Sequence, residues 1–84
     1  MRKVLTHQEA YGELLPLADE WRSIGILLDV PLDVINSISA EQLLDGMCLA
    51  AVLKWLEDKR REPRRKEIND VMEKIKAAQT EKKR

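Results

Sequence analysis

Apolar residues in this chain recur at helical spacing. In the stretch that opens with Trp21, the apolar residues Trp21, Ile24 and Leu28 stand at i, i+3 and i+7, which is the spacing of one face of an α-helix. Period-two alternation is absent, and no Asn-Gly or Asp-Gly turn lies between β-branched runs. The pattern therefore predicts an all-α fold.

Capping residues and prolines predict where the first three helices begin. Thr6 and Glu9 match the S/T-x-x-E capping box, so a first helix is expected to start directly after Thr6. Pro16 is expected to end or kink that helix, because proline lacks the helical donor. Asp19 is expected to be the N-cap of a second helix, and Pro31 is expected to occupy the first position of a short third helix.

The middle of the chain is less regular. Ser39 with Gln42 is a possible helix cap, whereas Gly46 costs up to about 1 kcal/mol inside a helix. We therefore favour a connector that holds Leu43 or Leu44 against the core, followed by a helix from about Asp45. Two adjacent apolar stripes over residues 48–56 predict that this fourth helix is central.

A fifth amphipathic helix is expected after the break at Pro63, since Ile68, Val71, Met72 and Ile75 again follow helical spacing. Residues 77–84 offer only alanine as apolar partners, so we expect a bundle over residues 7–76 and a flexible charged tail over 77–84. Ten residues are expected to be largely buried, namely Trp21, Ile24, Leu28, Ile35, Ile38, Val52, Trp55, Ile68, Val71 and Met72.

Length and composition narrow the function classes. With 84 residues the chain holds one domain at most, and a large active-site cleft is not expected. One cysteine and one histidine provide neither a disulfide nor a four-ligand zinc site. The longest apolar run, over residues 47–53, is far shorter than the roughly 20 residues that cross a bilayer. We expect a cytosolic protein without cofactor or metal.

The charges balance in total but are unevenly placed. Residues 1–53 hold three basic and eight acidic residues, a net charge of −5, and residues 54–84 hold twelve and seven, a net charge of +5. If these segments lie on different faces, the acidic face of one copy complements the basic face of the next. The alternative interpretation is an uneven but merely solvated surface.

The order of these landmarks resembles the death domain of the death-fold superfamily. The resemblance covers roughly residues 9–76 and rests on Trp21-x-x-Ile24-Gly25-x-x-Leu28, Val34-Ile35-x-x-Ile38, Cys48, Val52-Leu53-x-Trp55 and the segment from Pro63 to Ile75. It implies an antiparallel bundle in which the two tryptophans pack together. Death effector and caspase-recruitment folds share the pattern and remain alternatives. The family ends with a sixth amphipathic helix, for which this chain has no apolar periodicity, so five helices with the sixth short or absent are expected.

Residues suited to catalysis are not arranged for it. Cys48 lies in the most apolar stretch, where burial makes a thiol inert, and His7 is expected on the surface of a first helical turn. Acidic neighbours such as Glu57 and Asp58 diverge around a helix, and three isolated glycines form no phosphate loop. The sequence gives no reason to propose an enzyme or a small-molecule substrate.

Two function classes remain. The resemblance implies a non-catalytic adaptor that assembles with another death-fold domain, or with itself, in apoptotic, inflammatory or innate immune signalling. Charge placement then predicts a basic partner-binding face and an acidic one. The basic residues are Arg60, Arg61, Arg64 and Arg65, and the acidic residues are Asp29, Asp33, Glu41 and Asp45.

The second class is nucleic-acid binding through the basic segment 59–66. Three features favour the interaction module instead. The net charge is balanced, acidic residues are interspersed around this segment, and no aromatic residue for base stacking lies among its cations.

Overall fold

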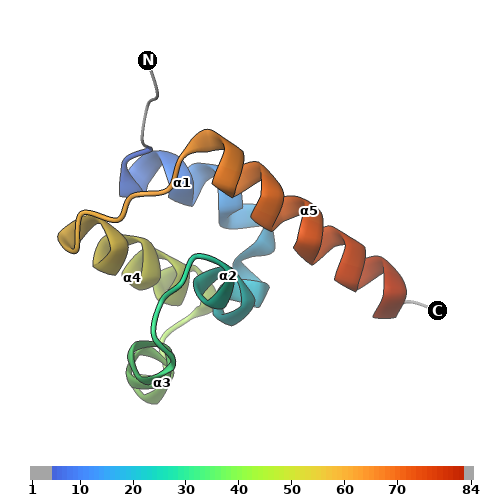
Figure 1. The fold of residues 1–84 in the computed structure, drawn as a ribbon. Coiled ribbons are helices and arrows are strands. Elements are labelled where there is room, and N and C mark those ends of the chain that lie inside the picture. Colours follow the sequence, from blue (N-terminus) through green and yellow to red (C-terminus); the bar gives the residue numbers. More distant parts are fainter. Residues whose placement is uncertain (1–4, 83–84) are drawn as a thin grey trace.

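The computed structural model describes residues 5–82 and is all-helical over that range, with no β-strand in it (Figure 1). The elements are α1 (His7–Leu14), η1 (Leu15–Glu20), α2 (Trp21–Leu27), α3 (Leu32–Ala40), α4 (Asp45–Asp58) and α5 (Arg65–Lys82). The all-α prediction is confirmed.

The predicted capping box forms at the start of α1. Glu9 donates its backbone N–H to the Thr6 hydroxyl at 3.2 Å, and the Glu9 carboxylate accepts from the Thr6 N–H at 3.1 Å. Pro16 then lies in the first turn of η1, a 3₁₀ segment that connects α1 to α2. The sequence therefore determines both the start of α1 and the change of helix type after it.

Two predicted helix starts are displaced by one residue. The residue before α2 is Glu20 and not Asp19, and its side chain makes no capping hydrogen bond. The Trp21 N–H donates to the Ala18 carbonyl of η1, so the two helical segments are continuous here. Pro31 stands one position before α3, where its carbonyl accepts from the N–H groups of Val34 and Ile35. α4 begins at Asp45, as expected.

Non-glycine residues in the left-handed backbone region end three helices. Asp29, Gln42 and Arg60 have φ of 65°, 55° and 56°. After α4 the Arg61 N–H donates to the Leu56 carbonyl at 2.8 Å and the Arg60 N–H donates to the Glu57 carbonyl at 3.0 Å. These two bonds form a Schellman motif, in which glycine usually takes the left-handed position.

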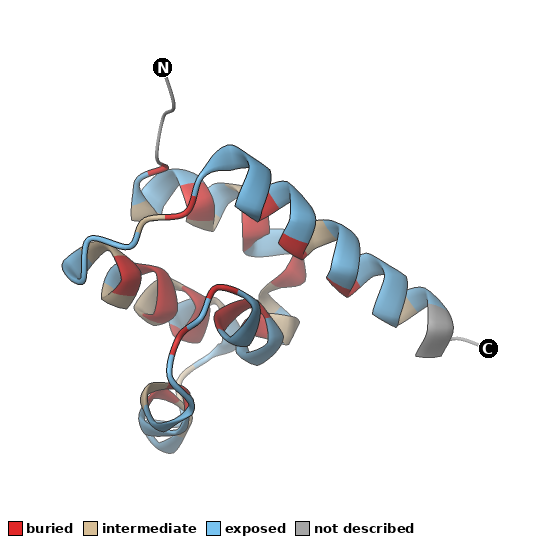
Figure 2. Ribbon diagram, in the orientation of Figure 1, coloured by how far each residue is buried: buried red, intermediate tan, exposed pale blue. Residues whose placement is uncertain are grey.

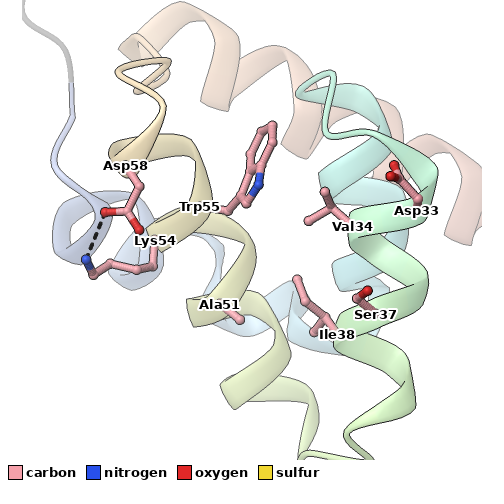
Figure 3. Close-up of a pocket in the computed structure, with 8 residues that line it drawn as sticks. All are labelled: Asp33, Val34, Ser37, Ile38, Ala51, Lys54, Trp55 and Asp58. Carbon is pink, nitrogen blue, oxygen red and sulfur yellow. Dashed lines mark hydrogen bonds and ion pairs between the residues drawn. The ribbon is translucent and has the colours of Figure 1, made fainter.

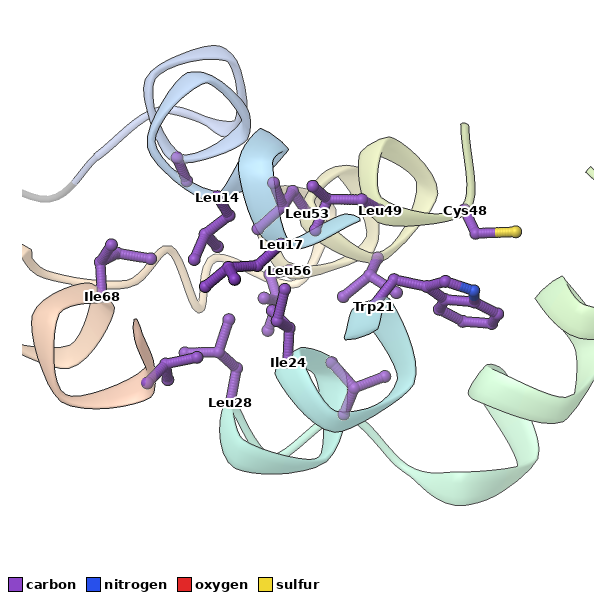
Figure 4. Packing of buried hydrophobic residues seen from close by; sticks show 14 of the residues in the cluster. Leu14, Leu17, Trp21, Ile24, Leu28, Cys48, Leu49, Leu53, Leu56 and Ile68 are labelled. Carbon is purple, nitrogen blue, oxygen red and sulfur yellow. The ribbon is translucent and has the colours of Figure 1, made fainter. Parts of the chain in front are cut away.

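The core surrounds α4, which contacts α1, η1, α2 and α3 (Figure 2). Figure 4 shows Leu14, Leu53 and Leu56 converging on the same interior from α1 and α4. Eight of the ten predicted core residues are buried, and they come from α2, α3, α4 and α5. Gly25 allows α2 to approach α3, since a Cβ there would lie 3.0 Å from Cδ1 of Ile35.

The two exceptions are Trp55 and Met72, which are only partly buried. Trp55 faces α3, which contacts only α2 and α4 and so covers one side of the indole. Their intermediate exposure and their packing against the core still agree with the expectation that both are largely buried. Helical spacing identifies the apolar face of a helix but not how far its neighbour extends, so it does not distinguish partial from complete burial.

α5 continues through residues 77–82, where we expected a flexible tail. Over residues 65–80, for which burial is described, Ile75 is the last buried residue of α5, and the C-terminal part of the helix extends past the other helices (Figure 1). The absence of apolar partners therefore ends the packing but not the helix. Residues 83–84 of the expected tail lie outside the described residues.

Candidate functional site

The four predicted basic residues lie where α4 gives way to α5. Arg60 and Arg61 belong to the Schellman motif after α4, and the Arg64 N–H donates to the Glu67 carboxylate at 3.0 Å at the start of α5. All four arginines are exposed. The turn and the cap together hold this group at one corner of the molecule.

Within the described residues, one of these arginines has an ion-pair partner. The Arg65 guanidinium lies 3.0 Å from a Glu13 carboxylate oxygen of α1. Arg60, Arg61 and Arg64 make no side-chain hydrogen bond or ion pair with any described residue. We call these three residues the basic corner, since they present the charge that remains available to a partner.

The structure divides the predicted acidic face into two pairs. Asp29 and Asp33 flank the connection from α2 to α3, whereas Glu41 and Asp45 flank the connection from α3 to α4. All four are exposed. Asp33 and Glu41 are separated by most of α3, about 12 Å at 1.5 Å per residue, so the four carboxylates do not form one surface.

The pair Glu41 and Asp45, which we call the acidic end, lies at the start of α4. The basic corner follows the other end of the same helix, about 20 Å away for a helix of this length. Both placements agree with the helix dipole, which favours an acidic residue in the first turn and basic residues after the last. α4 therefore separates the basic corner from the acidic end, which holds two of the four predicted acidic residues.

A groove of about 430 Å³ runs between α3 and α4 (Figure 3). Its apolar lining consists of Val34, Ile38, Ala51 and Trp55, with Asp33 and Asp58 among its polar residues. Asp58 accepts a hydrogen bond from Lys54 at 2.9 Å. The groove places Asp33 close to the end of α4 from which the basic corner follows.

Trp55 is the aromatic residue that the sequence did not associate with the basic segment. The Lys59 ammonium lies over the Trp55 ring, 5.8 Å from its centroid, one helical turn further along the chain. The spacing from Trp55 to Lys59 could have indicated this contact, since side chains four positions apart meet on a helix.

His7 makes a contact that its sequence position did not predict. Its Nδ1 lies 2.8 Å from Oε2 of Glu57, and its backbone N–H donates to the same oxygen at 3.2 Å. A hydrogen bond with the His7 side chain lowers the pKa of Glu57, and the hydrogen bond from the His7 backbone N–H lowers it further. The His7 side chain keeps 31% of its surface exposed, so it lies at the surface as expected, but its contact with α4 was not predicted.

Cys48 has the expected environment. It is buried, and burial followed by the charge of Asp45 raises the pKa of its thiol. Its Sγ donates to the Leu43 carbonyl at 3.6 Å. A protonated, enclosed thiol is a poor nucleophile.

Neither metal ligation nor a membrane span is supported over residues 5–82. No group of three or more His, Cys, Asp or Glu residues there is placed to hold a metal ion. No helix in this range combines the length and the apolar character needed to cross a membrane. Over the same residues, the charged ends of α4 and the α3–α4 groove are surface features to which a function can be attached.

Comparisons of this chain with protein-family models, curated proteins and solved structures found no match.

Proposed function

We propose that the chain is a non-catalytic interaction module of the death-fold type, an antiparallel bundle of five helices whose sixth helix is short or absent. Its role is to join another death-fold domain, or a second copy of itself, into a signalling assembly. The observation that carries the proposal is the placement of exposed, opposite charge clusters at the two ends of α4. The family resemblance adds the setting, a cytoplasmic adaptor in apoptotic, inflammatory or innate immune signalling.

The buried landmarks support the death-fold part of the proposal. Trp21, Ile24 and Leu28, which carry the resemblance in the second helix, are buried, and so are Val52 and Leu53 of the central helix. Residues that the family uses for packing thus pack here as well, which leaves the exposed charges for recognition.

Arginine suits the basic side of such a contact. Its planar guanidinium holds a carboxylate with two hydrogen bonds and is less strongly hydrated than the ammonium of lysine. An exposed pair is worth at most about 1 kcal/mol, so several pairs must act together. Association should then weaken as salt shortens the Debye length below roughly 10 Å.

The two clusters also define the geometry of assembly. A contact between the basic corner of one copy and an acidic pair of the next is head-to-tail, and such a contact extends into a filament unless its rotation closes a ring. The same chemistry allows a different death-fold domain to occupy either end.

Charge reversal tests the proposed function. The molecular mass of the chain, measured by analytical ultracentrifugation across concentration and salt, should rise with concentration and fall with salt. Arg60→Glu with Arg61→Glu should abolish association and leave the thermal midpoint nearly unchanged. Lys74→Glu with Lys76→Glu is the matched control, because it makes the same change of charge at exposed positions of α5.

Equal association of the two variants would contradict the proposal, as would a chain that neither self-associates nor binds any member of a panel of death-fold domains. In either case the uneven charge is a solvated surface.

Nucleic-acid binding is the second candidate, and the contact of Lys59 with Trp55 favours it, since an aromatic ring beside cations is a stacking platform for bases. Asp33 and Asp58 line the groove beside this ring and repel a phosphate backbone. A labelled single-stranded oligonucleotide that binds with a steep salt dependence, and that loses affinity in Trp55→Ala, would reverse the preference.

A further inference from the structure

Large apolar side chains are exposed in two places beside the acidic pairs and in a third place on α2. At the start of α4, Leu44 is 76% exposed and Met47 is 52% exposed, next to Glu41 and Asp45. At the second acidic pair, Leu32 is 62% exposed beside Asp33. Ile26 and Leu27 of α2 are also exposed, but they line a separate groove with Lys74 and Ile75 of α5. Isolated exposed leucines are common, but a group of exposed apolar side chains rimmed by polar residues is typical of an interaction site.

The first place, which we call the α4-start surface, comprises Glu41, Leu44, Asp45 and Met47. Leu44 precedes α4 and Met47 follows one turn later, so the two side chains are neighbours at i and i+3. Exposed Leu15 extends the apolar area, because a Cβ added at Gly46 would lie 3.9 Å from Cδ1 of Leu15.

Little positive charge opposes a cationic partner on this surface. Arg22 lies within electrostatic reach, since its charge acts on Cys48 in the first turn of α4. Its guanidinium, however, donates to the Ser39 hydroxyl at 2.6 Å and lies 5.0 Å from the centroid of the Trp21 ring. Arg22 therefore points its donors at its own chain.

The second place is less suited to the same partner. Asp33 lines the groove that Asp58 also lines, and the basic corner begins two residues beyond Asp58. A second copy that brought its arginines to Asp33 would meet the arginines of the first copy. At the α4-start surface, the first copy's own basic corner is the length of α4 away.

We propose that the α4-start surface is the receiving site for the basic corner of a second copy of this chain, with Leu44 and Met47 at the centre of the contact. This inference rests on the proposed function and narrows it from four carboxylates to one surface. The occupant follows from charge complementarity, since Arg60, Arg61 and Arg64 make no side-chain pair with any described residue of their own chain.

Arginine also explains why an apolar centre lies between two carboxylates. The aliphatic stem of an arginine covers apolar surface while its guanidinium reaches a charge at the rim. Burial of Leu44 and Met47 then adds to the affinity, whereas the pairs that Glu41 and Asp45 form with the arginines are required for association and set its orientation and rate.

The test uses two full-length variants that each lack one half of the contact. The first variant lacks the basic corner and carries Arg60→Gln, Arg61→Gln and Arg64→Gln. The second variant has a neutral acidic end and carries Glu41→Gln and Asp45→Asn. Neutral substitutions are chosen because reversed charges would create a second, artificial junction. Each variant alone should stay monomeric, and the mixture should form a 1:1 pair, measured by analytical ultracentrifugation and by titration calorimetry.

Apolar substitutions are then added to the first variant, whose α4-start surface is intact. Leu44→Ala with Met47→Ala should weaken the pair by about tenfold or more. Leu32→Ala, an exposed leucine beside the other acidic pair, should change the affinity by less than about twofold. Circular dichroism and the thermal midpoint of each variant should match those of the parent, because all three side chains are exposed.

The outcomes separate this inference from the proposed function. A 1:1 pair that is indifferent to Leu44→Ala with Met47→Ala would overturn the inference and leave the proposed function standing. The same holds if Asp29→Asn with Asp33→Asn, and not the acidic-end variant, abolishes self-association. A parent chain that remains monomeric at every concentration overturns the inference as well, and binding to another death-fold domain would then decide the proposed function by itself.

Discussion

The two sides of α4 differ in how completely they are covered. On the side that faces α1, η1 and α2, the residues Leu49, Val52, Leu53 and Leu56 are buried. On the other side, short α3 leaves a groove in which the Trp55 indole is only partly covered (Figure 3). The same helix is therefore a core element on one side and a surface element on the other.

This difference shows where stability and recognition are located. Buried apolar area stabilises the folded chain and is not available to a partner. The open side, the basic corner and the α4-start surface contribute less to stability and remain free to bind. Substitutions on the two sides should therefore have different consequences, which the following predictions order by size.

Leu53→Ala on the closed side should have the largest effect. Removing a fully buried leucine costs about 2 to 5 kcal/mol, which is comparable to the whole stability of a domain of this size. We expect a chain that is largely unfolded or that melts far below the parent, measured by thermal denaturation followed by circular dichroism. A midpoint within a few degrees of the parent would show that this side of α4 is not the core.

Trp55→Ala on the open side should cost less than Leu53→Ala. A fully buried tryptophan would cost about 3 to 5 kcal/mol, whereas partial exposure lowers our expectation to about 1 to 3 kcal/mol. The variant should still unfold cooperatively in urea, with a reduced midpoint. A loss equal to that of Leu53→Ala would mean that α3 covers the indole in solution.

Arg60→Gly should stabilise the chain by about 1 kcal/mol, because glycine adopts the left-handed conformation without the steric cost that arginine bears. The urea midpoint measures this gain. Arg61→Gly is the matched control, since Arg61 is not among the residues with positive φ and should gain nothing. If Arg60→Gly also weakens self-association, arginine at this position trades stability for recognition.

The pair of His7 and Glu57 should give the smallest effect, through pH. Because the folded chain lowers the pKa of Glu57 below its ordinary value of 4.5, the stability from this contact is present above that value. It is lost as the pH falls through the lower, folded pKa. Glu57→Gln should therefore lose less stability than the parent between neutral and acid pH, measured by urea denaturation at several pH values, and an identical pH dependence would contradict the assignment.

Local signals determined much of the fold. Thr6 and Glu9 predicted the start of α1, and the apolar stripes over residues 48–56 predicted a central α4, because capping and helical periodicity depend on residues within one or two turns. The candidate basic residues were also found from sequence, since Arg60 to Arg65 lie close together along the chain.

Only the tertiary structure decided which of these residues act together. It paired Arg65 with Glu13, brought His7 against Glu57, and left Trp55 half-covered, because each outcome depends on helices that are distant in sequence. It also divided the four predicted carboxylates into two pairs at opposite ends of α3. Composition and spacing determine which side chains each face of a helix carries. The length and placement of the neighbouring helices determine which of those side chains stay exposed and which residues they lie beside.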